Sequence, residues 1–166
     1  LGTGRAGAVV LFADAPGLTI GDINTTAANN FAGDVLLTAH VSGTINTQTI
    51  TANGAGADNS AGRILMTTAA GSLNIGAIQS IGTGGAESGQ VILNSSNAIT
   101  ASNIDVTNTI LNGGRVIITA GGNIAGTSIS LGTINTTGNS AGQIFIGSVD
   151  NANGTITTGN LTGNST

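Results

Sequence analysis

A short motif recurs six times along the chain at intervals close to 27 residues, and it constrains the fold more than any other feature. In each copy a small residue and a glycine precede one variable residue and three apolar residues, as in residues 6–11 and 113–118. The motif glycines are Gly7, Gly33, Gly62, Gly89, Gly114 and Gly142, separated by 26, 29, 27, 25 and 28 residues. A repeat of this length is typical of solenoids, in which each unit is one coil.

A second apolar pattern runs in phase with the motif. Its opening aliphatic residues are Leu18, Ile45, Leu73, Ile99, Ile124 and Ile156. Each is followed five residues later by another aliphatic: Ile23, Ile50, Ile78, Ile104, Ile129 and Leu161. The offset is constant while the segments around it vary in length. This indicates two packed pieces per unit, joined by variable loops.

Local propensity favours strands in both pieces. Apolar residues alternate with period two and many are β-branched, while glycine is spread throughout and weakens any helix. A unit of this size cannot bury its own apolar face, so stacked units share one core. The sequence therefore predicts an all-β fold, a parallel β-solenoid of about six coils. We expect one domain over residues 1–166, with coils starting near residues 6, 32, 61, 88, 113 and 141, and a right-handed coil.

The apolar positions of the motif predict where the core lies. Alternation puts the first and third apolar residues of each copy on one face and the middle residue on the other. The expected inward rows are Val9, Val35, Ile64, Val91, Val116 and Ile144, and Leu11, Leu37, Met66, Leu93, Ile118 and Ile146. The core is thus built from aliphatic residues, because the chain has no Trp or Tyr and only 3 Phe.

The middle residues form an outward stripe that is apolar in every copy. We predict it as a lateral interface, made of Val10, Leu36, Leu65, Ile92, Ile117 and Phe145. A sheet that is apolar on both faces is normally covered on both. Two interpretations are open: a loop of the same chain covers the stripe, or another protomer does. Soluble monomers seldom expose large apolar patches, which favours the second.

Two further predictions concern pairing. Asp34 and Arg63 follow the motif glycine in adjacent copies, so we expect them to form an ion pair on the surface. Neither end of the sequence carries a recognisable polar capping unit. We therefore expect the first coil to stack on the last coil of a neighbour, or both ends to continue into a longer chain.

Composition argues against several kinds of partner. Three Arg, no Lys and a net charge of −4 disfavour nucleic acid, which needs clustered positive charge. No apolar run approaches the length of a membrane-spanning helix, so no membrane insertion is expected. No signal peptide is recognisable, so the sequence is interpreted as a mature or excised segment.

The residues offer little for catalysis, cofactors or metals. The acids are Asp14, Asp22, Asp34, Asp58, Glu87, Asp105 and Asp150, and no two hold equivalent positions in adjacent copies. His40 is the only His and there is no Cys, so a His/Cys metal cluster is excluded. We expect no enzymatic activity and no cofactor. The alternative is a fragment of a carbohydrate-active β-helix enzyme, which acids clustered on one face would support.

The repeats resemble those of filamentous-haemagglutinin-like bacterial surface proteins. Residues 114–124 and 134–142 carry the resemblance, with their glycine, asparagine and β-branched pattern. It implies a β-helical shaft at the bacterial cell surface or outside the cell, built for adhesion or filament formation. The expected partners are other copies of the chain, or its own continuation, and cell-surface carbohydrate.

Overall fold

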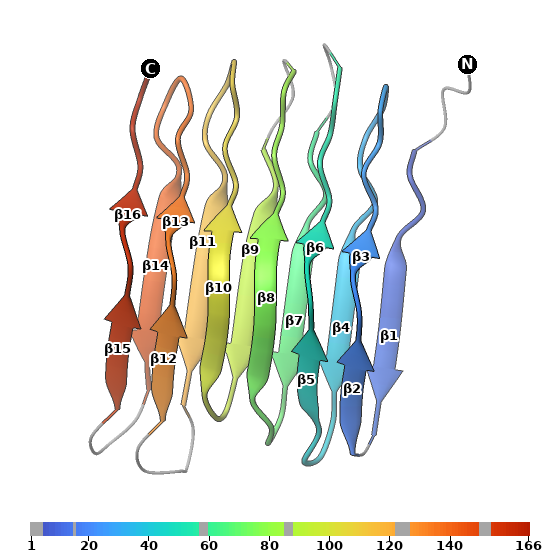
Figure 1. Cartoon of the computed structure of the whole chain (residues 1–166), viewed down its shortest axis with the longest axis vertical. Coiled ribbons are helices and arrows are strands. Elements are labelled where there is room, and N and C mark those ends of the chain that lie inside the picture. The colour runs from blue at the N-terminus through green and yellow to red at the C-terminus, as the bar shows by residue number, and fades with distance from the viewer. Residues whose placement is uncertain (1–4, 15, 57–59, 85–87, 122–126, 150–153) are drawn as a thin grey trace.

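A computed structural model describes residues 5–14, 16–56, 60–84, 88–121, 127–149 and 154–166. Within these ranges every strand pairing is parallel and there is no helix. The strands form two sheets that face each other across a common core (Figure 1). The predicted all-β parallel solenoid is confirmed.

Sheet A contains the first strand of each coil, in chain order. Its strands are β1 (Val9–Ala13), β4 (Val35–Ala39), β7 (Ile64–Thr68), β9 (Gln90–Ser95), β11 (Arg115–Ala120) and β14 (Gln143–Ser148). Val9 pairs with Val35 and so on through Val116 and Ile144, which is the predicted register. The passage from β1 to β14 makes about five turns, and β14 begins a last coil.

Sheet B contains the second piece of each coil, ten strands in all. In the third and fourth coils this piece is one strand, β8 (Leu73–Gln79) or β10 (Ile99–Asp105). In the other coils two residues outside any strand divide it into two strands: β2 (Gly17–Ile20) and β3 (Ile23–Asn24), β5 (Thr44–Thr47) and β6 (Ile50–Thr51), β12 (Ser128–Leu131) and β13 (Ile134–Asn135), β15 (Thr155–Thr158) and β16 (Leu161–Thr162). The coils are thus β1–β3, β4–β6, β7–β8, β9–β10, β11–β13 and β14–β16.

The fifth coil corrects one predicted register. Ile129 pairs with Ile99 and Ile156, and Ile134 pairs with Ile104 and Leu161. The two aliphatic residues that mark the sheet B piece of this coil are therefore Ile129 and Ile134. The prediction that this piece begins with Ile124 is wrong. Ile124 itself lies outside the described residues.

The main chain determines this register. The amides of Ile104 and Val106 donate to the carbonyl oxygens of Thr133 and Asn135, each at 2.9 Å. Aliphatic residues spaced by five occur twice in succession here, so spacing alone could not distinguish the two pairs.

The hand of the coil can be followed in Figure 1. The nearer strands, such as β8 and β10, run upward, while the farther strands, such as β7 and β9, run downward. Later coils lie to the left of earlier ones. This combination describes a right-handed coil, the usual hand for parallel crossovers.

Both predicted inward rows are buried in the four inner coils, where Val35 is the most accessible at 1% exposed. In the first and last coils the same rows are more open, and Leu11 is 37% exposed. The core is therefore continuous along the solenoid and partly open at its two ends.

Steric contact between coils explains the motif glycine. A Cβ on Gly33 would strike the carbonyl oxygen of Gly7, and one on Gly62 would strike that of Gly33. The same contact recurs for Gly89, Gly114 and Gly142, each against the motif glycine of the coil before. Only a residue without a side chain allows the backbones to approach this closely. At Gly7, in the first coil that the structure describes, a Cβ would have nothing within 4 Å.

Candidate interaction surface

The outer face of sheet A carries the predicted apolar residues, which we call the outer stripe. Val10 and Phe145, at its ends, are 51% and 59% exposed. The four residues between them are half-buried: Leu36, Leu65, Ile92 and Ile117. Figure 1 looks through both sheets, and the described connecting loops lie beyond the strand ends instead of across the strands. No described loop of this chain therefore covers the outer stripe.

Two further outward rows flank the stripe. The polar row precedes it along each strand and consists of Ala8, Asp34, Arg63, Gln90, Arg115 and Gln143. The threonine row follows it and consists of Phe12, Thr38, Thr67, Asn94, Thr119 and Gly147. An apolar stripe between two largely polar rows is the usual layout of a surface that packs against another protein.

The prediction of an ion pair between Asp34 and Arg63 is wrong, because Asp34 bonds to the main chain of Arg63 and not to its side chain. Asp34 and Arg63 do lie in adjacent coils, but Asp34 Oδ1 accepts a hydrogen bond from the Arg63 backbone amide at 2.7 Å. Asp22 and Asn103 make the same contact with the amides of Thr49 and Thr133. A short carboxylate reaches the main chain of the next coil without ordering a long arginine side chain. The guanidinium of Arg63 thus stays available for other contacts.

This contact leads to a prediction for Asp34. Asp34→Asn retains the accepting oxygen and should leave the free energy of unfolding nearly unchanged. Asp34→Ala removes the acceptor and should cost about 1 kcal/mol. Urea denaturation of the two variants checks this. Equal losses in both variants would show that the charge matters and the hydrogen bond does not.

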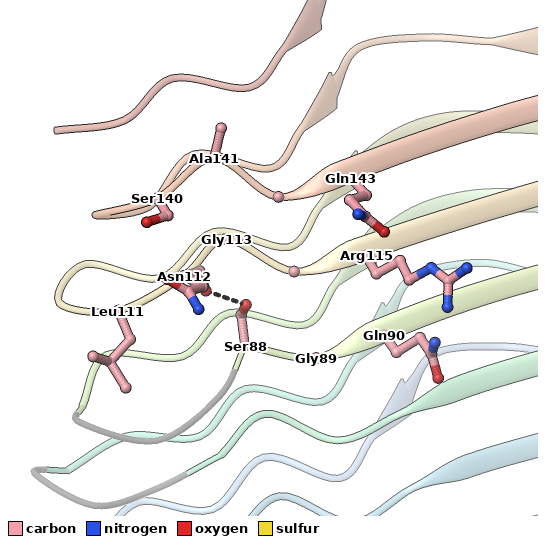
Figure 2. A pocket seen from close by; sticks show the side chains of 12 residues that line it. Ser88, Gly89, Gln90, Leu111, Asn112, Gly113, Arg115, Ser140, Ala141 and Gln143 are labelled. Atoms are coloured by element: carbon pink, nitrogen blue, oxygen red, sulfur yellow. Dashed lines mark hydrogen bonds between the residues drawn. The ribbon is translucent and has the colours of Figure 1, made fainter.

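A hollow lies where the polar row meets the turns of the last three coils. It has a volume of about 640 Å³, and Gln90, Arg115 and Gln143 project from neighbouring strands beside it (Figure 2). Among the turn residues that line it, Ser88 Oγ donates to the carbonyl oxygen of Asn112 at 2.7 Å. A second hollow of about 520 Å³ lies on the outer stripe, lined by Arg115, Ile117, Gln143, Ile144 and Phe145. One cation between neutral amides, beside apolar surface, suits a negatively charged group carried on an apolar partner.

The structure describes only some of the acids and the histidine that the sequence offers, for which no catalytic role is expected. In the described ranges no three His, Cys, Asp or Glu side chains come together as a metal site. Asp105 Oδ1 accepts from the Thr107 amide at 3.2 Å, a local turn contact. His40 is exposed, and its main-chain amide donates to Ala13. Asp58, Glu87 and Asp150 lie outside the described residues.

Comparison with known protein families, with curated proteins and with solved structures found no match to this chain. The resemblance to filamentous-haemagglutinin-like repeats therefore rests on the repeat residues alone. Nor does any helix that could cross a membrane occur in the part of the chain that the structure describes.

Proposed function

We propose that this chain is part of the structural shaft of an extracellular bacterial surface filament or adhesin. Its solenoid acts as a rigid rod that associates end to end through its first and last coils. The observation that supports this is the fit between the two end faces, in hydrogen bonding, apolar side chains and backbone shape.

The main-chain groups at the two ends are complementary. Val9 donates to the carbonyl oxygen of Asp34, so its main chain faces the second coil, and alternation turns that of Val10 away. At the other end Gln143 donates to Gly114, so the main chain of Ile144 faces away from the solenoid. A second copy placed one coil further would pair these outward groups in the same register that joins the coils within one chain. Open strand edges of this kind favour such pairing.

The apolar side chains at the ends support the same contact. Ile156 and Leu161 are 47% and 49% exposed, whereas their counterparts Ile129 and Ile134 in the fifth coil are fully buried. At the other end Leu11 is 37% exposed, whereas its counterpart Leu37 in the second coil is fully buried. A further coil on either end would bury these residues as the inner coils are buried. Because the contact is head to tail and does not close, it generates an open filament.

Gly7→Ala tests this proposal. Within one chain Gly7 has open space, so the variant should fold with unchanged stability. In a stack, Gly7 would lie against the last coil of the next copy as Gly33 lies against Gly7, and the added Cβ would strike backbone. We expect the variant to lose filaments in electron micrographs and to sediment as short species at concentrations where the wild type elongates.

Gly21→Ala is the matched control. Gly21 also has open space, and its counterpart in the second coil is Gln48, whose side chain is accepted above Gly21. In a stack Gly21 would likewise lie above a glycine, Gly159 of the next copy, so an added methyl group should fit. This variant should elongate like the wild type. Normal elongation of Gly7→Ala, or a wild type that never elongates, would contradict end-to-end stacking.

A further inference from the structure

We propose that two copies of this solenoid pack face to face through sheet A in opposite orientation, related by a two-fold axis parallel to the strands. The inference rests on the proposed shaft function and deepens it, because it names the partner and geometry of lateral contact. It does not depend on end-to-end stacking.

Such an axis fixes which residues face each other. It reverses the order of coils and keeps each row opposite itself. The first coil therefore faces the sixth, the second faces the fifth, and the third faces the fourth. Sheets that pack in this way lie about 10 Å apart, so outward side chains of the two copies meet between them.

In this arrangement the charges of the polar row are complementary. Asp34, in the second coil, faces Arg115 of the other copy, in the fifth coil, and the symmetry produces this pair twice. Arg63 faces the neutral Gln90. Asp34 binds the Arg63 amide through Oδ1, which leaves its second carboxylate oxygen for the partner. Arg115 lies beside a hollow that can admit a carboxylate.

The shapes of the other rows are complementary as well. Phe12, which is 62% exposed, faces Gly147, where only the neighbouring Phe145 ring lies within 4 Å of a Cβ position. Val10 faces Phe145, so the two most exposed residues of the outer stripe cover each other. In the threonine row the large Phe12 thus meets a residue without a side chain.

Neighbouring registers are less favourable. A shift of one coil in one direction places Arg63 against its own copy, and a shift in the other direction places Arg63 against Arg115 twice. Repulsion of this kind selects a register as strongly as attraction does. A shift of two coils pairs Asp34 with Arg63 but keeps only four of the six strands of sheet A in contact.

The alternative symmetry pairs no charges. A two-fold axis along the solenoid would keep each coil opposite itself and place the polar row against the threonine row. Asp34 would then face Thr38, and Phe145 would face Phe145.

The size of the contact predicts a weak dimer. Six strands spaced by ~4.8 Å and about six residues long, at ~3.3 Å each, offer roughly 500 Å² per copy. The total of roughly 1,000 Å² is at the lower limit for a stable interface. One segment should therefore dimerise only at high concentration. Many coils in a longer shaft would multiply the contact.

Charge exchange tests the pairing. All proteins carry Gly7→Ala, so that end-to-end stacking does not contribute, and dimerisation is measured by sedimentation equilibrium. Arg115→Glu and Asp34→Lys should each weaken the dimer about tenfold or more, since each places like charges opposite one another twice. The double variant should recover most of the affinity. Thermal melts confirm that each variant folds.

Two matched controls sharpen this test. Asp34→Asn keeps the hydrogen bond to the Arg63 amide and loses only the charge, so it should weaken the dimer. Arg63→Gln should not weaken it. If Arg63→Gln weakens the dimer while Arg115→Glu does not, the two copies are shifted by two coils and the proposed register is wrong.

Cross-linking reports the orientation independently. The chain has no cysteine, so single cysteines can be placed freely. Thr38 and Thr119 lie in the second and fifth coils of the threonine row and face each other in the proposed dimer. A short bis-maleimide should join Thr38→Cys to Thr119→Cys when the two proteins are mixed, and should join neither protein to itself.

Three outcomes overturn the proposal: no cross-link in the mixture, equal cross-linking in the unmixed samples, or a chain that stays monomeric at millimolar concentration. The last result, together with filaments formed by the protein that retains Gly7, would reject only the lateral contact. Dimers of the Gly7→Ala protein, together with no filaments from the protein that retains Gly7, would reject only the end-to-end contact.

Discussion

Replacing Gly114 by alanine should destabilise the solenoid strongly, while replacing Gly7 by alanine should not. The two glycines hold the same position in the repeat. In the fifth coil a Cβ at position 114 would strike the Gly89 carbonyl oxygen and lie 2.8 Å from the Cβ of Val106. Both contacts are with packed neighbours that cannot move aside separately. Overpacking of this kind costs about 1–3 kcal/mol or more.

Because the coils stack one on another, the loss of stability on Gly114→Ala should extend to coils on both sides of position 114. Each coil is stabilised mainly by its neighbours, so a weakened contact between the fourth and fifth coils partly uncouples the ends. Chemical denaturation followed by circular dichroism measures both effects: Gly7→Ala is compared with dilute wild type, and the Gly7→Ala/Gly114→Ala double variant is compared with Gly7→Ala. A Gly114→Ala protein as stable as its parent would show that the coils can separate to admit a methyl group.

This steric constraint explains why sheet A could be predicted from the sequence. The motif glycine sits two residues before the first inward residue of each coil, because every coil must leave room for the backbone of the next. Counting from Gly33 to Gly62 therefore gives the true pairing of Val35 with Ile64. The variable loops absorb the differences in length, and they do not disturb the register.

Sheet B is less constrained by its sequence, and there the prediction failed in one coil. Its strands are marked only by aliphatic residues five apart, and Ile129 satisfies that rule both as the first and as the second member of a pair. The deciding contact is the hydrogen bond between Ile104 and Thr133, which no sequence pattern reveals.

Polar side chains were also predicted incompletely, because their partners are main-chain groups of other segments. Ser80 is fully buried and donates to the Gly62 carbonyl oxygen at 2.6 Å, and Thr25 donates to that of Gly33 at 2.7 Å. These hydroxyls occupy a core row whose members in other coils include Ala52 and Val106. A small polar residue fits this row only where a carbonyl oxygen is within reach.

The outer stripe was predicted from alternation alone, and the structure places it on the outer face of sheet A. The surface proposed to pack against the outer stripe could not be predicted from the sequence pattern of a single strand. The match between Asp34 and Arg115 appears only when whole coils are compared in reverse order. A contact of this kind depends on the position of each coil in the stack, which is a property of the folded solenoid.

Truncating Leu93 to alanine should cost far more than truncating Leu11, although both belong to the same inward row. Leu93 is fully buried and pairs with Met66 on one side and Ile118 on the other. Removing its side chain leaves a cavity between rigid neighbours, which costs about 2–5 kcal/mol. Leu11 pairs only with Leu37 and is 37% exposed, so its truncation in an isolated solenoid should cost about 1 kcal/mol or less.

The comparison becomes decisive when it is repeated in filaments. In a Gly7→Ala background the solenoids are single, and the costs of the two truncations should differ as stated. Where Gly7 is retained and solenoids stack, Leu11 becomes an inner residue with a further coil on its open side. The loss of stability on Leu11→Ala should then rise toward that of Leu93→Ala, while the Leu93→Ala value stays constant. Melting of dilute and of filamentous samples measures both values. A Leu11→Ala cost that is the same in both states would show that no coil covers the first one.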